Sequence, residues 1–185
     1  MKKLNIFIII LMAIVCFGCK ETYCPGFPKS INYFPYNKNQ KITFVNSQHE
    51  ESSYKIISCE NSESWSYKWN CKCACEAEST FLMNQIQDSL DVNYISVHGM
   101  IIISGGESVT DIEMSVRFSD FSSEYFTKTL YEGEKIFHTK IDKFFADTIS
   151  IENNNNKLFK KVVIVKDKGL VSYTTADGEE WKLVE

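Results

Sequence analysis

The sequence predicts an all-β domain, an antiparallel β-sandwich or barrel of roughly ten strands with little helix. Short segments in which apolar and polar residues alternate recur along the chain, and this period of two is typical of strands that bury one face. Glycine, asparagine and aspartate separate these segments at short spacing, as in turns between antiparallel strands. Helical spacing appears over 120–132, where serine and threonine favour a single helical turn or a loop.

The strictest alternation covers residues 65–75 and organises the expected sheet. Every odd position is aromatic or cysteine, and every even position is small, polar or charged. We expect one half-buried strand that buries Trp65, Tyr67 and Trp69 on the same face as the cysteines that follow. The alternative for these aromatic residues is an exposed platform for sugar rings. The segment 54–59 can pair with this strand as a tight hairpin.

The remaining strands follow from the same pattern. The segment 112–118 is the clearest one-sided strand, because its four apolar residues alternate with polar ones. The segment 92–104 is so apolar that we expect both of its faces to be buried. The other expected strands, in chain order, are 42–44, 81–83, 135–141, 144–151, 159–165, 170–175 and 180–184.

The N-terminus has the pattern of an export signal. Lys2 and Lys3 precede an unbroken apolar run over 6–17, which has the length of a secretory signal and is short for a membrane span. The run ends in Gly18 and Cys19, which resemble the lipobox of bacterial lipoproteins. This resemblance implies cleavage before Cys19 and a membrane anchor through a lipid on that cysteine. An ordinary cleaved signal or an uncleaved anchor is the alternative.

The expected domain organisation is a signal peptide over 1–18, a lipid-anchored tether over 19–39 and a single β domain over 40–185. Lys20 and Glu21 resemble, in part, the surface-export signal of Bacteroidetes-type lipoproteins. The whole chain, with its lipobox, its CPGFP stretch and an end that reads GLVSYTTADGEEWKL, resembles small lipoproteins of unknown function from that group. The resemblance implies an outer membrane lipoprotein that faces the periplasm or the cell surface. It implies no activity.

The charge of the chain argues against a nucleic-acid partner. Removal of residues 1–18 takes away Lys2 and Lys3 and no acidic residue, so the basic residues fall from 20 to 18 against 24 acidic ones, a formal net charge of −6. Arg117 is the single arginine of the sequence, so a bidentate arginine cluster for phosphate cannot form. We expect no nucleic-acid role.

The cysteines of an exported protein are expected to form disulfides. Residues i and i+2 of one strand are about 6.5 to 7 Å apart, at the upper limit for a bridge, so the cysteines of 71–75 should seek partners elsewhere. A tight hairpin would put Cys59 opposite Trp65, which leaves Cys24 as the better partner. A thiolate zinc or copper site and free thiols are the alternatives, and we expect no metal. The disulfide candidates are Cys24, Cys59, Cys71, Cys73 and Cys75.

The sequence favours a binding domain over an enzyme. It has none of the common catalytic or cofactor-binding motifs, so we expect no enzyme and no cofactor. The aromatic residues Tyr33, Phe34 and Tyr36 are candidate ligand contacts, although packing onto the sheet would explain them as well. We expect an envelope-anchored, non-enzymatic domain that binds an envelope protein or a glycan. The alternatives are a structural accessory of an envelope complex and a small glycan-active hydrolase with scattered carboxylates.

Overall fold

The computed structural model describes residues 27–28, 30–62, 65–69, 72–86, 95–105, 109–119, 125–134, 143–153 and 159–184. These residues form strands and connecting segments, with one short 3₁₀ turn at 143–144 and no α-helix among them. The strands are β1 (Lys41–Val45), β2 (Glu51–Asn61), β3 (Trp65–Trp69), β4 (Lys72–Gln85), β5 (Ser96–Gly105), β6 (Val109–Ser119), β7 (Tyr125–Glu134), β8 (Thr148–Glu152), β9 (Phe159–Val165), β10 (Gly169–Thr175) and β11 (Glu180–Leu183).

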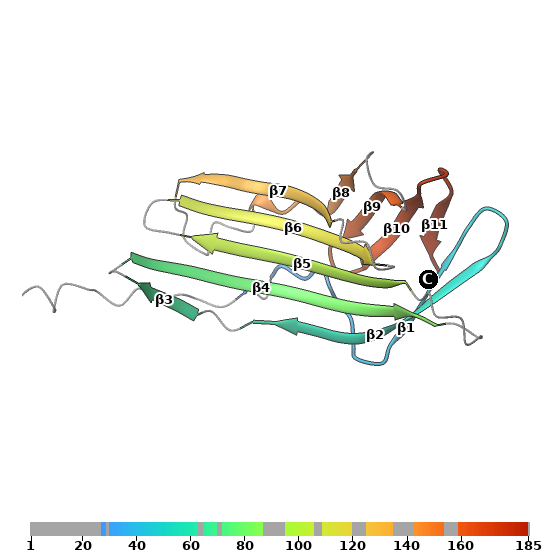
Figure 1. The fold of residues 1–185 in the computed structure, drawn as a ribbon, viewed down its shortest axis with the longest axis horizontal. Helices are drawn as coiled ribbons and strands as arrows, with labels where there is room; N and C mark the ends of the chain where they lie inside the picture. Colours follow the sequence, from blue (N-terminus) through green and yellow to red (C-terminus); the bar gives the residue numbers. More distant parts are fainter. Residues whose placement is uncertain are drawn as a thin grey trace, which may run out of the picture.

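Ten of these strands form one antiparallel sheet in the order β7-β6-β5-β4-β2-β1-β11-β10-β9-β8, and β3 pairs with β4 outside this path. The long strands β4 to β7 run side by side, and β8 to β11 cross them (Figure 1). The sheet is nearly closed into a barrel, because its end strands approach each other: Lys128 Nζ on β7 donates a 3.0 Å hydrogen bond to the Ser150 carbonyl on β8. The predicted all-β antiparallel fold is confirmed, and of its two forms the structure has the barrel shape.

Bulges allow this sheet to bend. The register shifts by a residue between β2 and β4, between β6 and β7, and at two places between β9 and β10. An extra residue in one strand bends that strand and increases its twist. These shifts therefore help one continuous sheet to coil until β7 and β8 meet.

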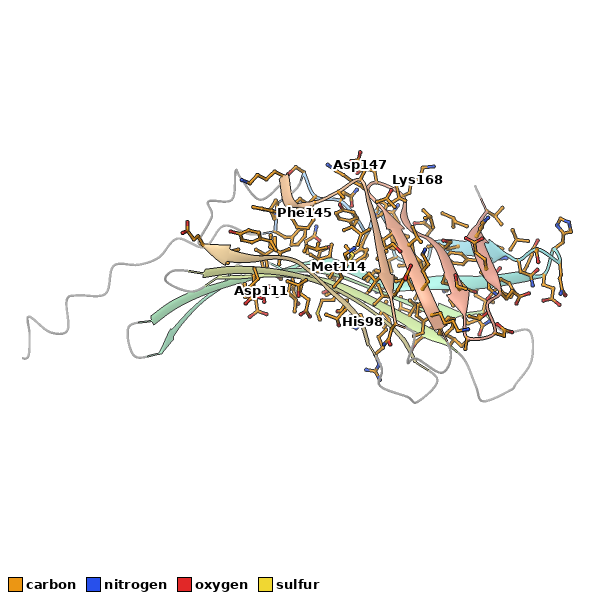
Figure 2. All side chains as sticks on the ribbon, turned by 90° about the horizontal axis from the view of Figure 1, so that it is seen from above. His98, Asp111, Met114, Phe145, Asp147 and Lys168 are labelled. Carbon is orange, nitrogen blue, oxygen red and sulfur yellow. The ribbon has the colours of Figure 1, made fainter. Side chains whose placement is uncertain are left out.

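Side chains fill the interior of the sheet (Figure 2). The centroid of the Tyr173 ring lies 5.1 Å from that of Phe44 and 5.5 Å from those of Phe118 and Phe159. The Tyr54 hydroxyl lies 3.4 Å from the Tyr173 hydroxyl, and burial raises the pKa of both phenols. Since buried hydroxyls need partners, this contact allows two polar groups to sit within the aromatic core.

The chain before β1 packs into the same core. We call residues 27–28 and 30–36 the strap. The ring centroids of Phe34 and Tyr36 lie 4.7 and 5.0 Å from that of Phe81 on β4. The strap lies within the range expected as a tether, 19–39, but these contacts make it part of the folded β domain. Its buried side chains are Phe27, Ile31, Tyr33 and Phe34.

Hydrogen bonds tie the strap to the turn between β9 and β10. The backbone N–H of Asp167 donates to the Asn32 carbonyl at 2.7 Å, and the N–H of Leu170 donates to the Tyr36 hydroxyl at 2.6 Å. Gly169 lies between these two points with φ of +86°, and a Cβ on it would come within 2.2 Å of the Tyr36 oxygen. Glycine is thus needed there both for its backbone conformation and for the close approach of Tyr36.

The segment expected as one strand over 65–75 is a hairpin instead. Trp65 is the register partner of Glu76, and Trp69 that of Lys72, so the chain reverses between Trp69 and Lys72. The single-strand prediction is wrong because β3 gains a ladder of main-chain hydrogen bonds by pairing with β4. Since register partners share a side of a sheet, positions 65, 67 and 69 are not on the same side as positions 73 and 75.

Three further expectations on strand pairing and boundaries are wrong. The hairpin between 54–59 and the organising strand does not form, because β2 pairs with β4, with Cys59 opposite Phe81. The helical turn or loop over 120–132 is a strand from Tyr125 onward, since β7 pairs with β6. The expected strand over 144–151 begins only at Thr148. The strand expected over 135–141 lies outside the described residues.

Candidate functional site

The side chains of β4, β5 and β6 that point away from the core form a continuous surface, which we call the outward face. Along each strand, buried residues alternate with half-buried ones, except at the buried Ser115 of β6, and the half-buried row points outward. Asp111 and His98 lie on this side of the sheet, whereas Met114 lies on the core side (Figure 2). The outward face comprises Glu76, Glu78, Thr80, Leu82, His98, Met100, Ile102, Ser104, Asp111, Glu113 and Arg117.

Two pairs of carboxylates flank β5 on the outward face. Glu76 and Glu78 belong to β4, Asp111 and Glu113 belong to β6, and Ile102 of β5 is the register partner of both Glu78 and Glu113. Neighbouring strands are about 4.8 Å apart, so the backbones of Glu78 and Glu113 are about 10 Å apart. At this separation the two pairs are suited to separate cationic groups rather than to one shared ion.

The carboxylates of the outward face have no lysine partner among the described side chains. Salt bridges between described side chains join Lys161 with Glu152 and Lys182 with Glu180, on other strands. Asp111 Oδ1 is shielded from solvent and accepts no hydrogen bond from any described group. A shielded carboxylate oxygen without a donor is energetically unfavourable, so a cation that reached Asp111 would stabilise it.

The other end of the outward face is less acidic. Leu82, His98 and Arg117 are register partners across the three strands. Burial, and then the positive charge of Arg117, lower the pKa of His98, while Glu78 acts in the opposite direction. His98 is therefore a neutral imidazole at neutral pH, and the charge of the outward face comes from its carboxylates and Arg117.

A third pair of carboxylates, outside the outward face, converges on one buried amide. Asn46 Nδ2 donates 2.8 Å hydrogen bonds to Glu50 Oε2 and to Glu179 Oε1. The orientation of this amide is fixed, because Asn46 Oδ1 accepts from the backbone N–H groups of Gln48 and Glu50. The bonds join the turn between β1 and β2 to the turn between β10 and β11. Sequence spacing could not show that residues so far apart in the chain meet.

The end strand β7 carries a charge that hinders its pairing with another chain. Lys128 is the register partner of the fully buried Met114, so it belongs to the inward row of β7, yet it is exposed and reaches Ser150 on β8. An inward-pointing charge on an edge strand hinders edge-to-edge association. This arrangement favours the outward face over the sheet edge as an interaction surface.

Of the predicted disulfide candidates, the structure describes the side chain of Cys59. It is a half-buried free thiol that donates a 3.2 Å hydrogen bond to the Phe34 carbonyl, and burial raises its pKa. No disulfide is present among the described side chains. Cys19, Cys24 and Cys71 lie outside the described residues, as do the side chains of Cys73 and Cys75, so the predicted bridge between Cys24 and the 71–75 cysteines stays a prediction.

The predicted ligand contacts Tyr33, Phe34 and Tyr36 are placed in the strap. The Tyr33 hydroxyl donates to the Ala146 carbonyl, and its burial, followed by the charges of two nearby aspartates, raises its pKa to about 12. Burial likewise raises the pKa of Tyr36. Packing onto the sheet, the alternative for these residues, accounts for their positions.

Comparison with known proteins gives no relative. No family model, no curated protein and no solved structure matches the chain. Within the described ranges, no group of three or more histidine, cysteine, aspartate or glutamate residues could hold a metal ion. Nor does that part of the chain include a helix long and apolar enough to cross a membrane.

The outward face was missed in the sequence because β5 was expected to be buried on both faces. The structure buries one face of β5 and leaves Ser96, His98, Met100 and the two alternate residues that follow half-buried. The polar residues among them, Ser96, His98 and Ser104, all fall on even positions, and this is the signal that distinguishes the two faces.

Proposed function

We propose that the protein is an envelope lipoprotein, anchored through Cys19, whose β domain binds a partner protein without catalysing a reaction. The outward face is the observation that carries this proposal. Leu82, Met100 and Ile102 lie there half-buried, on the side of the sheet away from the core, with charged residues around them. An apolar centre with a charged surround is typical of protein interfaces. The aromatic core, in contrast, already fills the interior of the sheet.

The chemistry of the face favours a cationic partner. Its carboxylates on β4 and β6 flank Ile102, and lysine or arginine side chains have apolar stems that can cover Ile102 while their charged ends reach the carboxylates. The mature chain carries a formal net charge of −6, which would also speed the approach of a basic partner.

Site-specific photo-crosslinking in cells tests the surface. A photoreactive amino acid that replaces Met100 should yield a crosslinked partner, which mass spectrometry identifies. The same photoreactive amino acid in place of Val163, which is half-buried on β9 outside the outward face, should yield none. Equal crosslinking from both positions, or none from Met100, contradicts the proposal.

Charge variants test the chemistry of the partner. Glu78→Gln with Glu113→Gln removes two charges from the outward face, and Glu51→Gln with Asp147→Asn removes two charges elsewhere. The first pair should abolish the salt-sensitive part of partner binding, and the second pair should leave it nearly unchanged. If both pairs weaken binding equally, net charge and not the outward face is responsible.

A small hydrolase is the second candidate, because Glu50 and Glu179 meet at Asn46. Both carboxylate oxygens lie 2.8 Å from one nitrogen, so they are closer together than two hydrogen-bond lengths. Glycosidases that retain configuration hold their carboxyl groups about 5 to 5.5 Å apart. Activity on envelope glycans that is lost in Glu179→Gln and kept in Glu180→Gln would support this candidate over the binding domain.

A further inference from the structure

The exposed large hydrophobic side chains of the described residues gather on one part of the sheet surface. They are Ile57, Ile86 and Val184, which are 36%, 42% and 50% exposed. The Ile86 N–H donates to the Ser53 carbonyl at 2.7 Å, and the Val184 N–H donates to the Thr43 carbonyl at 2.8 Å. Ser53 and Thr43 are register partners of each other. Since register partners share a side of a sheet, these four residues form one row with two hydroxyls in its middle.

Two lysines without a carboxylate partner among the described side chains lie beside this row. Lys41 and Lys55 are exposed register partners, two residues along their strands from Thr43 and Ser53, so they point to the same side. The salt bridges between described side chains involve other lysines. Like charges directly opposite each other destabilise an antiparallel pair. The pair is therefore unfavourable within the fold, and an anionic surface would relieve its repulsion.

The composition of this surface fits a lipid bilayer better than a protein. We call Lys41, Lys55, Ile57, Ile86 and Val184 the lysine patch. Protein interfaces are enriched in arginine, methionine and aromatic residues and depleted of lysine, and the lysine patch has none of the enriched types. On anionic lipid, lysine ammonium groups can reach the phosphates while their stems and the apolar side chains enter the interface.

The middle of the row can leave water at little cost. The Thr43 and Ser53 hydroxyls lie 2.9 Å apart and are hydrogen-bonded to each other. The carboxylates nearby lie away from the lysines: Glu51 is beyond the row, four residues from Lys55, which is about 13 Å along a strand. Glu78 of the outward face is eight residues before Ile86, about 26 Å, which is about three Debye lengths at physiological ionic strength.

We infer that the lysine patch docks on a membrane surface that contains anionic lipid. This inference goes beyond the proposed function, because it concerns another surface and requires neither a lipid on Cys19 nor the outward face. The paired positive charges and the exposed side chains of Ile57, Ile86 and Val184 then have a common role that the fold alone does not give them.

The test uses the full-length protein with a photoreactive amino acid in place of Ile86. Vesicles of phosphatidylcholine with phosphatidylglycerol are compared with vesicles of phosphatidylcholine alone, and mass spectrometry measures lipid adducts. The same photoreactive amino acid in place of Val163 on β9 is the position control. Lys55→Glu and Lys160→Glu make the same change of net charge, the first in the lysine patch and the second on β9. Lys55→Glu puts opposite charges across from each other at Lys41, so this variant should be at least as stable as wild type.

We expect lipid adducts from position 86 on the anionic vesicles, and severalfold fewer from position 163. Reversal of one lysine charge near an anionic surface weakens binding by about thirtyfold, so Lys55→Glu should lose most adducts while Lys160→Glu keeps them. Equal yields from positions 86 and 163, or yields that phosphatidylglycerol does not raise, would overturn the inference. So would a Lys55→Glu protein with wild-type yields. Crosslinks in cells from position 86 to a protein and not to lipid would also overturn it.

Discussion

Substitution of Gly169 by alanine measures how strongly the strap is bound to the barrel-shaped sheet. Gly169 has φ of +86°, where an L-residue with a Cβ is strained by about 1–2 kcal/mol. The new Cβ would also lie 2.2 Å from the Tyr36 oxygen and 2.5 Å from its Cζ, so Tyr36 must move and leave the Leu170 N–H without its partner. An unsatisfied buried donor costs about 1–3 kcal/mol. We expect Gly169→Ala to lower the free energy of unfolding by about 2–5 kcal/mol.

Gly178→Ala is the matched control for this experiment. Gly178 has φ of +96°, and nothing lies within 4 Å of the position of its Cβ, so backbone strain of about 1–2 kcal/mol is the whole expected effect. Chemical denaturation measures the free energy of unfolding of both variants, and the difference between them is the part due to the strap. Gly169→Ala combined with Tyr36→Phe should cost less than the two single changes together, because the hydroxyl contact can be lost only once. Equal destabilisation by the two glycine variants would refute the contact between strap and turn.

Three further predictions follow from the core, the Asn46 cluster and the outward face. Phe81→Ala, at a fully buried ring, should cost about 3–5 kcal/mol in chemical denaturation, against under about 0.5 kcal/mol for the exposed Ile57→Ala. Asn46→Asp places a third carboxylate beside two, so it should destabilise more than Asn46→Ala at pH 7 and lose this excess in acid. The pKa of His98 is lowered in the folded protein, so as the pH falls the imidazole is protonated first in the unfolded chain. The free energy of unfolding that is present above pH 6.5 is therefore partly lost below pH 6.5. A His98→Gln variant should therefore lose less stability than wild type from about pH 8 to about pH 5; a larger loss would contradict the assignment.

Local alternation in the sequence predicted those strands whose two faces differ clearly. Ile112, Met114 and Val116 are fully buried, as the one-sided pattern of 112–118 requires, and the expected strands 159–165 and 170–175 coincide with β9 and β10. In these strands the residue types alone decide which face is buried, since each apolar side chain stabilises the fold when it faces the core. The all-β antiparallel class follows from such strands alone.

The pairing of strands could not be predicted in the same way. The alternation over 65–75 continues through the reversal between Trp69 and Lys72, because a two-residue connection shifts neither the period nor the composition. The sequence has no glycine or proline between Trp69 and Lys72, and Asn70 is the single residue there of a type common in turns. The partner of β2 was likewise undecided by its sequence, since β4 offers a much longer edge than β3 does.

The strap shows a related limit of sequence reasoning. Its prolines and its place before the first alternating segment are typical of an extended tether. An extended segment can still be buried if a partner surface is present. That surface is Phe81, which belongs to a strand nearly fifty residues later in the chain, so no local signal could reveal it. The aromatic density of Tyr33, Phe34 and Tyr36 was the available indication of packing.

The strap and the outward face use opposite sides of β4. Phe81 points to the core side, where Phe34 and Tyr36 pack on it, while its neighbour Leu82 belongs to the outward face. The strap therefore leaves the outward face uncovered. Under the proposed function, therefore, the residues that pack the strap onto the core are not those that would meet the partner, namely Leu82 and the carboxylates of β4 and β6.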